Sequence, residues 1–390
     1  MKSAGSTEDA GAGPMLFEPL SLRSVTLKNR IVVSPMSMYS AVEGVADDLH
    51  LVQLGRFAMG GAGLALMEAA AVSRDGRITH GCLGLWLDTH VRPLRRVVDF
   101  LHRFGCAAGI QIGHSGPKGS AQRPWHGGAP LGTDDATSRG EEGWPVVSSF
   151  PVPFDDGWPT PVPLAETGMD SLVLDYRNAA RRAREAGFDT VELHCAHGYL
   201  LHAFLSPLVN RREDRYGGSL ENRMRLPLRV AEAIRAEWPD SKPVLVRISA
   251  VDGVDIGWSI EDSVAFAKEL ADRGIDAIDC SSGGVKLHRG NVLSSRIPGF
   301  QVPFSARIRR EAKIPTIAVG LIREPRQAED VLRSGGADLV ALGRELLVNP
   351  NWSAQAALSL RGGDGWREWP ELFRWWLERR DRQLAPKVVS

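Results

Sequence analysis

Short hydrophobic segments recur along this chain and alternate with amphipathic helical patterns. The short segments are apolar on both faces, which is typical of strands in a parallel sheet that helices cover on both sides. We predict strands at 31–36, 64–72, 108–113, 190–194, 244–249, 277–281, 316–319 and 339–342. Eight strands in one unbroken alternation with helices favour a closed (β/α)8 TIM barrel, an α/β fold, over a doubly wound sheet.

Glycines mark the predicted ends of three helices that lie between these strands. Gly187, Gly274 and Gly336 each stand just past the last apolar position of the helical pattern. Glycine is favoured there because the residue after a helix often has a left-handed backbone conformation.

Three segments lie outside the strand–helix alternation. Residues 17–30 alternate between apolar and polar and predict a β-hairpin that caps the bottom of the barrel. Residues 117–165, after the third strand, are rich in Pro, Gly, Ser and Asp and predict a long loop: a lid, a binding loop or a disordered segment. Residues 1–14 lack the apolar core of a secretory signal and predict a disordered tail, which leaves 15–390 as one domain.

Composition narrows the classes of partner. The 390 residues include 47 basic and 47 acidic side chains, so the sequence predicts neither a nucleic-acid partner nor a membrane surface. No run of eighteen apolar residues occurs, and we expect no membrane span. The four cysteines form no CxxC pair, which suits buried thiols in a reduced, cytoplasmic compartment.

Polar residues gather where the predicted strands end. In a TIM barrel the active site lies at the carboxyl ends of the strands. The candidates at these ends are Ser37, Tyr39, Glu68, Gln111, His114, His194, His197, Tyr199, Arg247, 281–284, Gly320, Gly343 and Arg344.

Two kinds of ligand fit such a list. Gln111 offers a donor and an acceptor to a heterocyclic amide, Arg247 requires an anionic partner, and Gly343 with Arg344 suits a phosphate after the last strand. Together these features describe flavin mononucleotide (FMN). The alternative is a metal-dependent lyase or hydrolase that uses His194 and His197 with Glu68, although carboxylates are scarce at these ends.

Several segments resemble the Old Yellow Enzyme family, in particular its bacterial, thermophilic-like and xenobiotic-reductase-like ene-reductases. They include SPMSMYS (34–40), QIGHSGPK (111–118) and ELHCAHGYLLHAFLSPLVNRREDRYGGSLENR (192–223). The resemblance runs from about residue 16 to 347 and implies an FMN enzyme that NADPH or NADH reduces. It implies FMN contacts from Ser34, Pro35, Met36, Ser37, Ala69, Gln111, Arg247, Gly320, Gly343 and Arg344.

The resemblance also implies a reaction. His194 and His197 would hold the oxygen of an α,β-unsaturated carbonyl, nitro or thioester substrate, with Tyr39 nearby. Hydride would pass from N5 of the reduced flavin to the β-carbon, and Tyr199 would supply a proton. No metal is implied.

Two positions depart from the family pattern. Ser37 stands where this branch usually has a cysteine, and Pro117 stands where it usually has an arginine. We expect these differences to shift the flavin potential. A further hypothesis is that the protein binds FMN and a ligand but has no turnover.

The C-terminal segment 366–382 predicts an aromatic helix. Trp366, Trp369, Phe373 and Trp376 fall on one face at helical spacing, which suggests an interface in a homodimer or homotetramer. By the family resemblance, Trp376 and Arg379 would reach the substrate site of a neighbouring subunit.

Overall fold

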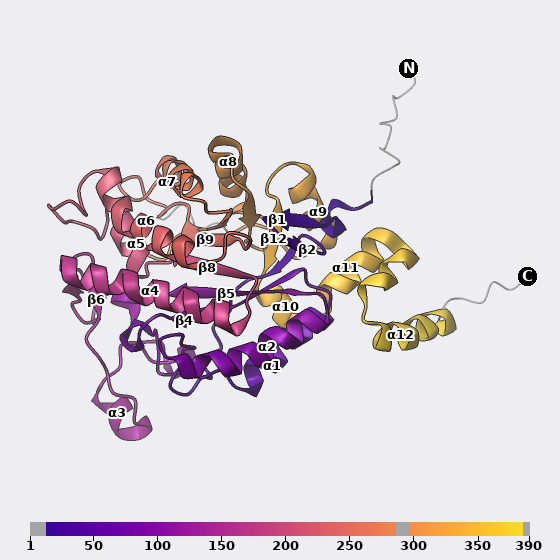
Figure 1. Cartoon of the computed structure of the whole chain (residues 1–390), viewed down its shortest axis with the longest axis horizontal. Coiled ribbons are helices and arrows are strands. Elements are labelled where there is room, and N and C mark those ends of the chain that lie inside the picture. The colour runs from indigo at the N-terminus through magenta and orange to yellow at the C-terminus, as the bar shows by residue number, and fades with distance from the viewer. Residues whose placement is uncertain (1–12, 286–295, 385–390) are drawn as a thin grey trace, which may run out of the picture.

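The computed structural model describes residues 13–285 and 296–384 and contains a closed barrel of eight parallel strands. Figure 1 shows the barrel strands enclosed by helices. Around the barrel the strand order is β10-β11-β12-β3-β4-β5-β8-β9, so the last strand in sequence pairs with the first. The barrel strands are β3 (Ile31–Val33), β4 (Leu64–Ala71), β5 (Ala107–Gly113), β8 (Thr190–Cys195), β9 (Val244–Ser249), β10 (Ala277–Ser281), β11 (Thr316–Ala318) and β12 (Leu339–Leu342). The predicted TIM barrel is confirmed.

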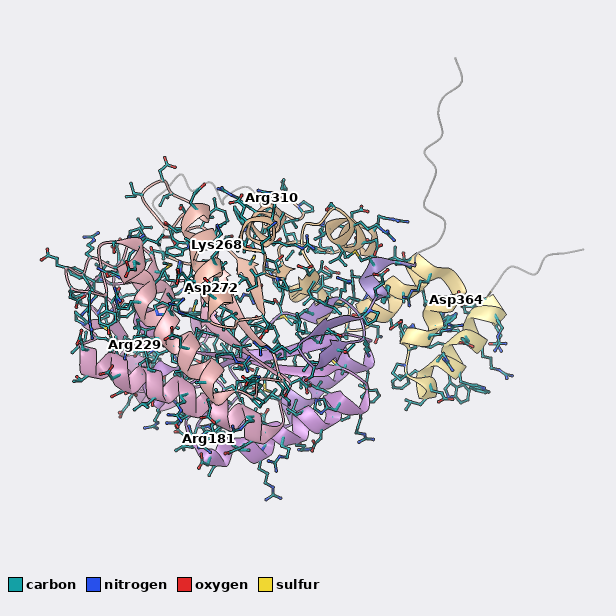
Figure 2. All side chains as sticks on the ribbon, turned by 45° about the horizontal axis from the view of Figure 1, so that its top comes forward. Arg181, Arg229, Lys268, Asp272, Arg310 and Asp364 are labelled. Atoms are coloured by element: carbon teal, nitrogen blue, oxygen red, sulfur yellow. The ribbon has the colours of Figure 1, made fainter. Side chains whose placement is uncertain are left out.

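Helices connect successive strands and form the outer ring. They are α1 (Asp48–Met59), α2 (Val91–Arg103), α4 (Glu166–Ala186), α6 (Leu220–Glu237), α7 (Ile260–Asp272), α8 (Val302–Ala312), α9 (Pro325–Arg333) and α10 (Arg344–Val348). A further short helix, α5 (Leu200–Leu205), follows β8. Figure 2 shows Arg181, Arg229 and Lys268 among the polar side chains on the outside of this ring. None of the described helices is long and apolar enough to cross a membrane.

Strand ends differ from the prediction at the first strand. β3 ends at Val33, whereas the sequence predicted a strand to residue 36. Pro35 has no N–H for a ladder bond, so the chain leaves the sheet at Ser34. The segment 34–40 is thereby freed to cross the mouth of the barrel.

Helix ends agree with the prediction at two of the three glycines. Gly187 caps α4 with φ 96°, and Gly274 has φ 79° just after α7. The prediction for Gly336 was one residue off, because α9 ends at Arg333 and the left-handed residue is Gly335, with φ 72°.

The lower half of the barrel is filled by hydrophobic side chains. Inward positions on the strands form one cluster with the hairpin β1 (Leu20–Leu22) and β2 (Val25–Leu27). Leu22 and Leu27 belong to this cluster, so the hairpin closes the bottom of the barrel as predicted.

The upper half of the interior is polar. The inward faces of four neighbouring strands carry Gln111, Glu192, Arg247 and Asp279. Arg247 and Asp279 stand two positions beyond Leu245 and Ala277 of the hydrophobic cluster. The register places His194 beside Arg247 and Arg247 beside Asp279. This change from apolar to polar along each strand creates the candidate site.

The insert after β5 is more ordered than the sequence suggested. It contains the short helix α3 (Thr133–Arg139) and a small parallel pair, β6 (Val147–Ser148) and β7 (Val162–Pro163). Seven residues are too few to give a visible helical period, and the Asp135 carboxylate instead starts α3 by accepting from the Gly132 N–H at 2.8 Å.

The C-terminal elements stand apart from the barrel mouth. α11 (Trp352–Arg361) and the 3₁₀ helix η7 (Gly362–Glu368) pack together, and α12 (Glu371–Leu384) lies against η7. Figure 1 shows α12 projecting beyond the barrel on the side away from the insert helix α3. The predicted tail at residues 1–14 lies almost wholly outside the described residues.

Candidate active site at the barrel mouth

His194 and His197 lie side by side at the end of β8. Nε2 of His194 is 3.4 Å from Nδ1 of His197, and the two rings are nearly perpendicular with centroids 5.1 Å apart. His197 has a positive φ of 60°, a strained conformation for a residue with a side chain. This turn brings the His197 ring back over the strand end, next to His194.

A hydrogen bond fixes the tautomer of His194, and the direction of a second one sets the tautomer of His197. The N–H of Ala196 donates to Nδ1 of His194 at 3.2 Å, so the proton of this neutral ring sits on Nε2. The Ser281 hydroxyl lies 2.7 Å from Nε2 of His197. When Ser281 donates there, the proton of His197 sits on Nδ1, and two N–H groups face one location.

Both imidazoles are neutral in the folded protein. Burial lowers the pKa of His194 and that of His197 well below the usual histidine value, and the positive charge of Arg247 adds to this effect. Neutral imidazoles donate hydrogen bonds without the cost of burying charge. The pair is therefore suited to a polar oxygen of a neutral ligand.

Tyr199 completes the cluster from the loop after His197. Its ring stands edge-on to His194, with centroids 4.9 Å apart. A small cavity of about 20 Å³ lies here, lined in part by Ala69, His194 and Tyr199. Burial raises the pKa of Tyr199, so the phenol keeps its proton through the neutral and alkaline range.

The insert covers this cluster through Lys118. The Lys118 ammonium donates to the His197 carbonyl at 2.9 Å and lies 5.2 Å from the Tyr199 ring centroid and 4.4 Å from that of Phe154. Burial lowers the pKa of Lys118 to about 8. The adjacent Pro117 is buried, so the first residues of the insert pack into the protein beside this cluster.

Tyr39 enters from the segment after β3. It has a positive φ of 53°, and the Nε of Arg123 in the insert donates to its carbonyl at 3.0 Å. Burial raises the pKa of Tyr39 to about 12, while a hydrogen bond from Ser37 opposes the shift. Ser37 thus has a local partner at the mouth.

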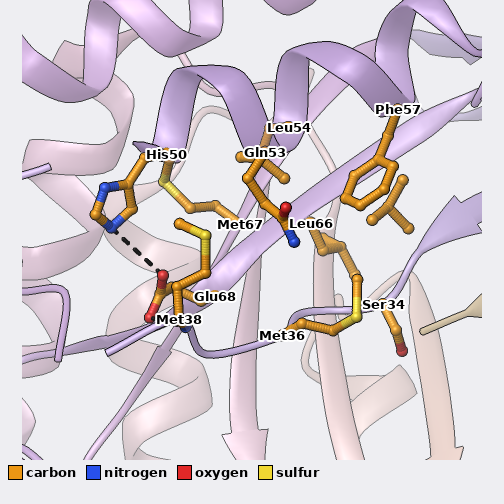
Figure 3. A pocket seen from close by; sticks show the side chains of 11 residues that line it. Ser34, Met36, Met38, His50, Gln53, Leu54, Phe57, Leu66, Met67 and Glu68 are labelled. Carbon is orange, nitrogen blue, oxygen red and sulfur yellow. Dashed lines mark hydrogen bonds and ion pairs between the residues drawn. The ribbon is translucent and has the colours of Figure 1, made fainter. Parts of the chain in front are cut away.

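Glu68 is directed away from the histidine pair. Figure 3 shows its carboxylate beside His50 of α1, with Oε1 3.4 Å from His50 Nε2. The other oxygen, Oε2, accepts from the Met38 N–H at 3.2 Å, which holds the segment after β3. Glu68 therefore does not form a ligand set with His194 and His197, and within the ranges 13–285 and 296–384 no group of three metal-ligating side chains is found.

A second group of the predicted residues meets beside β3. Ser34 and Met36 lie against Gly343, where an added Cβ would stand 3.8 Å from Ser34 Cβ and from Met36 Sδ. Nη1 of Arg247 is 3.4 Å from the Ser34 hydroxyl. Figure 3 shows Ser34 and Met36 along the segment that leaves β3.

The Arg247 guanidinium has weak contacts for a buried charge. Its side chain is 9% exposed, and its Nε is 3.5 Å from Asp279 and has no hydrogen-bond partner among the described residues. A buried cation of this kind needs an anionic neighbour. A flavin that gains negative charge on reduction fits this position, so Ser34, Gln111 and Arg247 suit FMN.

The other predicted cofactor residues lie at the rim. Pro35 and Ser37 belong to the segment after β3 and are half-buried, as is Gly320 after β11. Arg344 is exposed at the start of α10, next to Gly343.

Two predicted substrate contacts lie elsewhere in this chain. Trp376 is 66% exposed on α12, and Arg379 lies on the same helix, 5.7 Å from the Trp375 ring. The single chain does not bring them to His194.

Four buried residues of the site were missed from the sequence. Glu192 and Asp279 are fully buried inside the barrel, where the register pairs Glu192 with Gln111 and Asp279 with Arg247. His202 and Asp252 are also fully buried, 3.1 Å apart, and Nδ1 of His202 accepts from the Gly198 N–H at 2.8 Å. An acidic residue at an inward position of a buried strand was the available signal for the first two.

Comparison with known proteins identifies the class. A family model described as the NADH:flavin oxidoreductase / NADH oxidase family matches residues 15–361. The barrel with this mouth is thus a flavin-binding barrel, and the chain belongs to that family, the Old Yellow Enzyme family.

Individual relatives agree. A NADPH dehydrogenase of Listeria monocytogenes serotype 4a (strain HCC23) is 44% identical over 347 residues, 88% of this chain and 95% of that protein. A NADPH dehydrogenase of Geobacillus sp. (strain WCH70) is 43% identical over 348 residues, 89% of this chain and 94% of that protein. A solved structure of morphinone reductase in complex with tetrahydroNAD superposes with a TM-score of 0.71 at 27% identity, covering 89% of this chain and 91% of that one.

The chain is therefore an FMN-dependent NADPH oxidoreductase. The metal-dependent alternative is wrong, because the family is a flavin family and Glu68 pairs with His50.

Proposed function

We propose that this protein is an ene-reductase for small α,β-unsaturated carbonyl, nitro or thioester compounds. The observation that carries the proposal is the pair of nitrogens of His194 and His197, 3.4 Å apart, with the Tyr199 ring 4.9 Å from that of His194. Two donors that converge on one point, next to a phenol, suit a substrate that gains negative charge on oxygen and a proton on carbon.

His194 and His197 hold the substrate oxygen in this proposal. Their N–H groups polarise the conjugated double bond and stabilise the enolate oxygen as negative charge develops there. Because both rings are neutral, with His194 buried and His197 half-buried, the donors are fixed before the substrate arrives. Such donors typically contribute a rate factor of roughly 10²–10³ each.

Tyr199 supplies a proton to the α-carbon. Its raised pKa keeps the phenol protonated at rest, as an acid requires. Bound FMN supplies the hydride for the β-carbon. Tyr39, at the mouth, contacts the substrate oxygen from the segment after β3.

The nicotinamide that reduces FMN binds at the same mouth. The solved structure of morphinone reductase in complex with tetrahydroNAD supports a nicotinamide site in this fold. Reductant and substrate then bind in turn. NADPH is the reductant named for the curated relatives.

We further propose that the protein is a homo-oligomer whose interface includes α12. No α12 residue is buried, and Leu372, Trp375 and Trp376 are 61%, 55% and 66% exposed. An apolar patch of this kind on a terminal helix is typical of a subunit interface. A neighbouring copy could then receive Trp376 and Arg379 at its substrate site.

An anaerobic titration tests the proposed function. The purified protein is reduced with NADPH until the flavin absorbance is bleached, and cyclohexenone, maleimide, a nitroolefin or an enoyl thioester is then added. We expect at least one compound to restore the absorbance and to yield the product with a saturated C–C bond. If only molecular oxygen reoxidises the flavin, the protein is not an ene-reductase.

A further inference from the structure

We propose that Glu192 and Asp279 share one proton beneath the FMN site, position Gln111 and Arg247, and couple reduction of the flavin to the uptake of a further proton. Both are positioning residues, since they act through Gln111 and Arg247 on the neighbouring strands. The proposal rests on the FMN cofactor alone and does not depend on the substrate class.

The two carboxyl groups lie at the centre of the barrel. Glu192 on β8 and Asp279 on β10 flank β9, and both are 0% exposed. Their side chains lie within hydrogen-bonding reach of each other. Two acidic groups at this depth are rare, because burial of an isolated charge is very costly.

Each carboxyl group also contacts a residue of the cofactor site. Nε2 of Gln111 donates to Oε1 of Glu192 at 2.7 Å, and Nε of Arg247 lies 3.5 Å from Oδ2 of Asp279. The contact with Glu192 fixes the orientation of the Gln111 amide, so that its carbonyl oxygen remains available to the cofactor. Asp279 likewise holds one side of the guanidinium, while Ser34 lies 3.4 Å from the other.

Charge balance requires a proton in this group. If both carboxyls were ionised, one guanidinium would face two negative charges in a buried volume. One shared proton makes the group of two carboxyls and one guanidinium neutral. Oε2 of Glu192 and both oxygens of Asp279 have no hydrogen-bond partner among the described residues, and the shared proton gives the pair a donor between them. Burial raises the pKa of both carboxyls, the charge of Asp279 raises that of Glu192 further through repulsion, and Arg247 opposes both shifts.

Within the described part of the chain, the surroundings of the two carboxyl groups contain no second positive charge that could replace the proton. Among the described residues, β5 contributes the neutral amide of Gln111, and the neighbouring Cys280 on β10 is kept neutral because burial raises its pKa. His194, the next inward residue on β8, is neutral as well. The remaining strands line the layer below with apolar side chains: Val32, Leu66, Leu245, Ile317 and Ala341.

Reduction of FMN changes the charge beside this group. Hydride from the nicotinamide adds two electrons and one proton to the ring, which leaves one net negative charge that Arg247 faces. The Arg247 guanidinium then interacts with this negative charge as well as with the carboxyl pair, so it neutralises the pair less well. The pair therefore binds its proton more tightly in the reduced protein than in the oxidised protein.

A pH window follows from this difference. At neutral pH the pair holds its proton in both states, and reduction takes up one proton for two electrons. At alkaline pH the oxidised protein has lost the shared proton, and reduction takes up two. At alkaline pH the equilibrium constant for reduction then falls one hundredfold per pH unit, whereas at neutral pH it falls tenfold. For a two-electron couple, the midpoint potential therefore falls by about 60 mV per pH unit at alkaline pH and by about 30 mV at neutral pH.

The experiment measures the FMN midpoint potential from about pH 6 to about pH 10, in the purified holoprotein without substrate. We expect the steeper slope in the alkaline part of the range for the wild type. Glu192→Gln and Asp279→Asn should keep the shallow slope throughout, because a single carboxylate beside Arg247 stays ionised. Glu329→Gln is the matched control: it removes another buried carboxylate, one that accepts from Met15 and Leu16 far from the mouth, and should keep the wild-type profile.

A second measurement covers variants that fail to fold or to bind FMN. The infrared difference between reduced and oxidised wild-type protein at alkaline pH should contain the carbonyl band of a protonated carboxylic acid, shifted in D₂O. A wild-type potential with one shallow slope throughout, a steep slope that persists in both amide variants, or the absence of this band would overturn the proposal. Failure of every enone to reoxidise the flavin would contradict the proposed ene-reductase function but not the shared proton of Glu192 and Asp279, so the two proposals are tested separately.

Discussion

The Ser281 hydroxyl at the end of β10 lies 2.7 Å from Nε2 of His197, which follows β8. Strand β9 separates β10 from β8 in the barrel. The direction of the contact between Ser281 and His197 sets which nitrogen of His197 carries the proton, because the hydroxyl can donate or accept. A serine that donates to Nε2 places the His197 proton on Nδ1, next to the Nε2–H of His194. The two-donor site thus depends on Ser281, a residue of β10 rather than of β8.

Ser281→Ala should weaken the substrate contact without loss of FMN. Without the donor, His197 is free to place its proton on Nε2, and one of the two hydrogen bonds to the substrate oxygen is lost. One such bond corresponds to about 1 kcal/mol, so we expect the rate of flavin reoxidation by cyclohexenone to fall roughly fivefold. Ser282→Ala is the control, because the neighbouring Ser282 bonds to Gln301 and should keep the wild-type rate. An unchanged rate in Ser281→Ala would show that Ser281 does not set the tautomer of His197.

Tyr199→Phe should slow the oxidation of the reduced flavin by the enone and leave its reduction by NADPH unchanged. The phenyl ring keeps the packing against His194, and only the proton donor is lost. General acid catalysis contributes a factor of about 10²–10⁴, which is the expected loss in single-turnover reoxidation. Tyr216→Phe, at a buried tyrosine that bonds to Arg229, serves as the control. Equal rates in the wild type and in Tyr199→Phe would exclude the tyrosine as the acid.

Lys118 should make the stability of the protein rise with pH above about 8. Its pKa is about 8 in the folded protein and about 10.4 in an unfolded chain. Between these values the unfolded state binds more protons, so the free energy of unfolding increases with pH, by at most about 1.4 kcal/mol per pH unit.

Denaturant unfolding of Lys118→Met at pH values on both sides of this range tests the effect. The variant should lose the pH-dependent gain, whereas Lys268→Met, at an exposed position on α7, should retain it. The same gain in Lys118→Met as in the wild type would show that the lysine keeps its ordinary pKa.

The exposed aromatic residues of α12 should determine the oligomeric state. Trp375→Ser combined with Trp376→Ser removes the largest apolar side chains of the helix and should shift the protein toward a smaller species in sedimentation velocity. Arg380→Ser, on the same helix, should leave the sedimentation coefficient unchanged. A wild-type protein that sediments as a monomer would reject the proposed interface.

The fold could be predicted because the signals for it are local. Apolar strands, glycine caps and the hairpin pattern lie within short windows, and the barrel follows from counting them. The cluster of His194, His197 and Tyr199 was equally accessible, since all three lie within six residues of one strand end.

Contacts between distant strands could not be read in this way. Glu192 and Asp279 meet only because the barrel brings β8 and β10 to either side of Arg247. Glu68 looked like a ligand at a strand end, but an irregularity in β4 between Met67 and Ala70 accompanies its turn toward His50 of α1. Register shifts of this kind leave no clear mark in one sequence.

Anaerobic reoxidation of the NADPH-reduced protein by cyclohexenone, followed in a stopped-flow instrument, tests the central role of the two imidazoles most directly. We expect His194→Ala and His197→Ala each to lower the rate by roughly 10²–10³, and the double variant to add little, because both groups act on one oxygen. His126→Ala, at an exposed histidine of the insert, is the control and should react like the wild type. Reoxidation of either single variant at the wild-type rate would contradict the account.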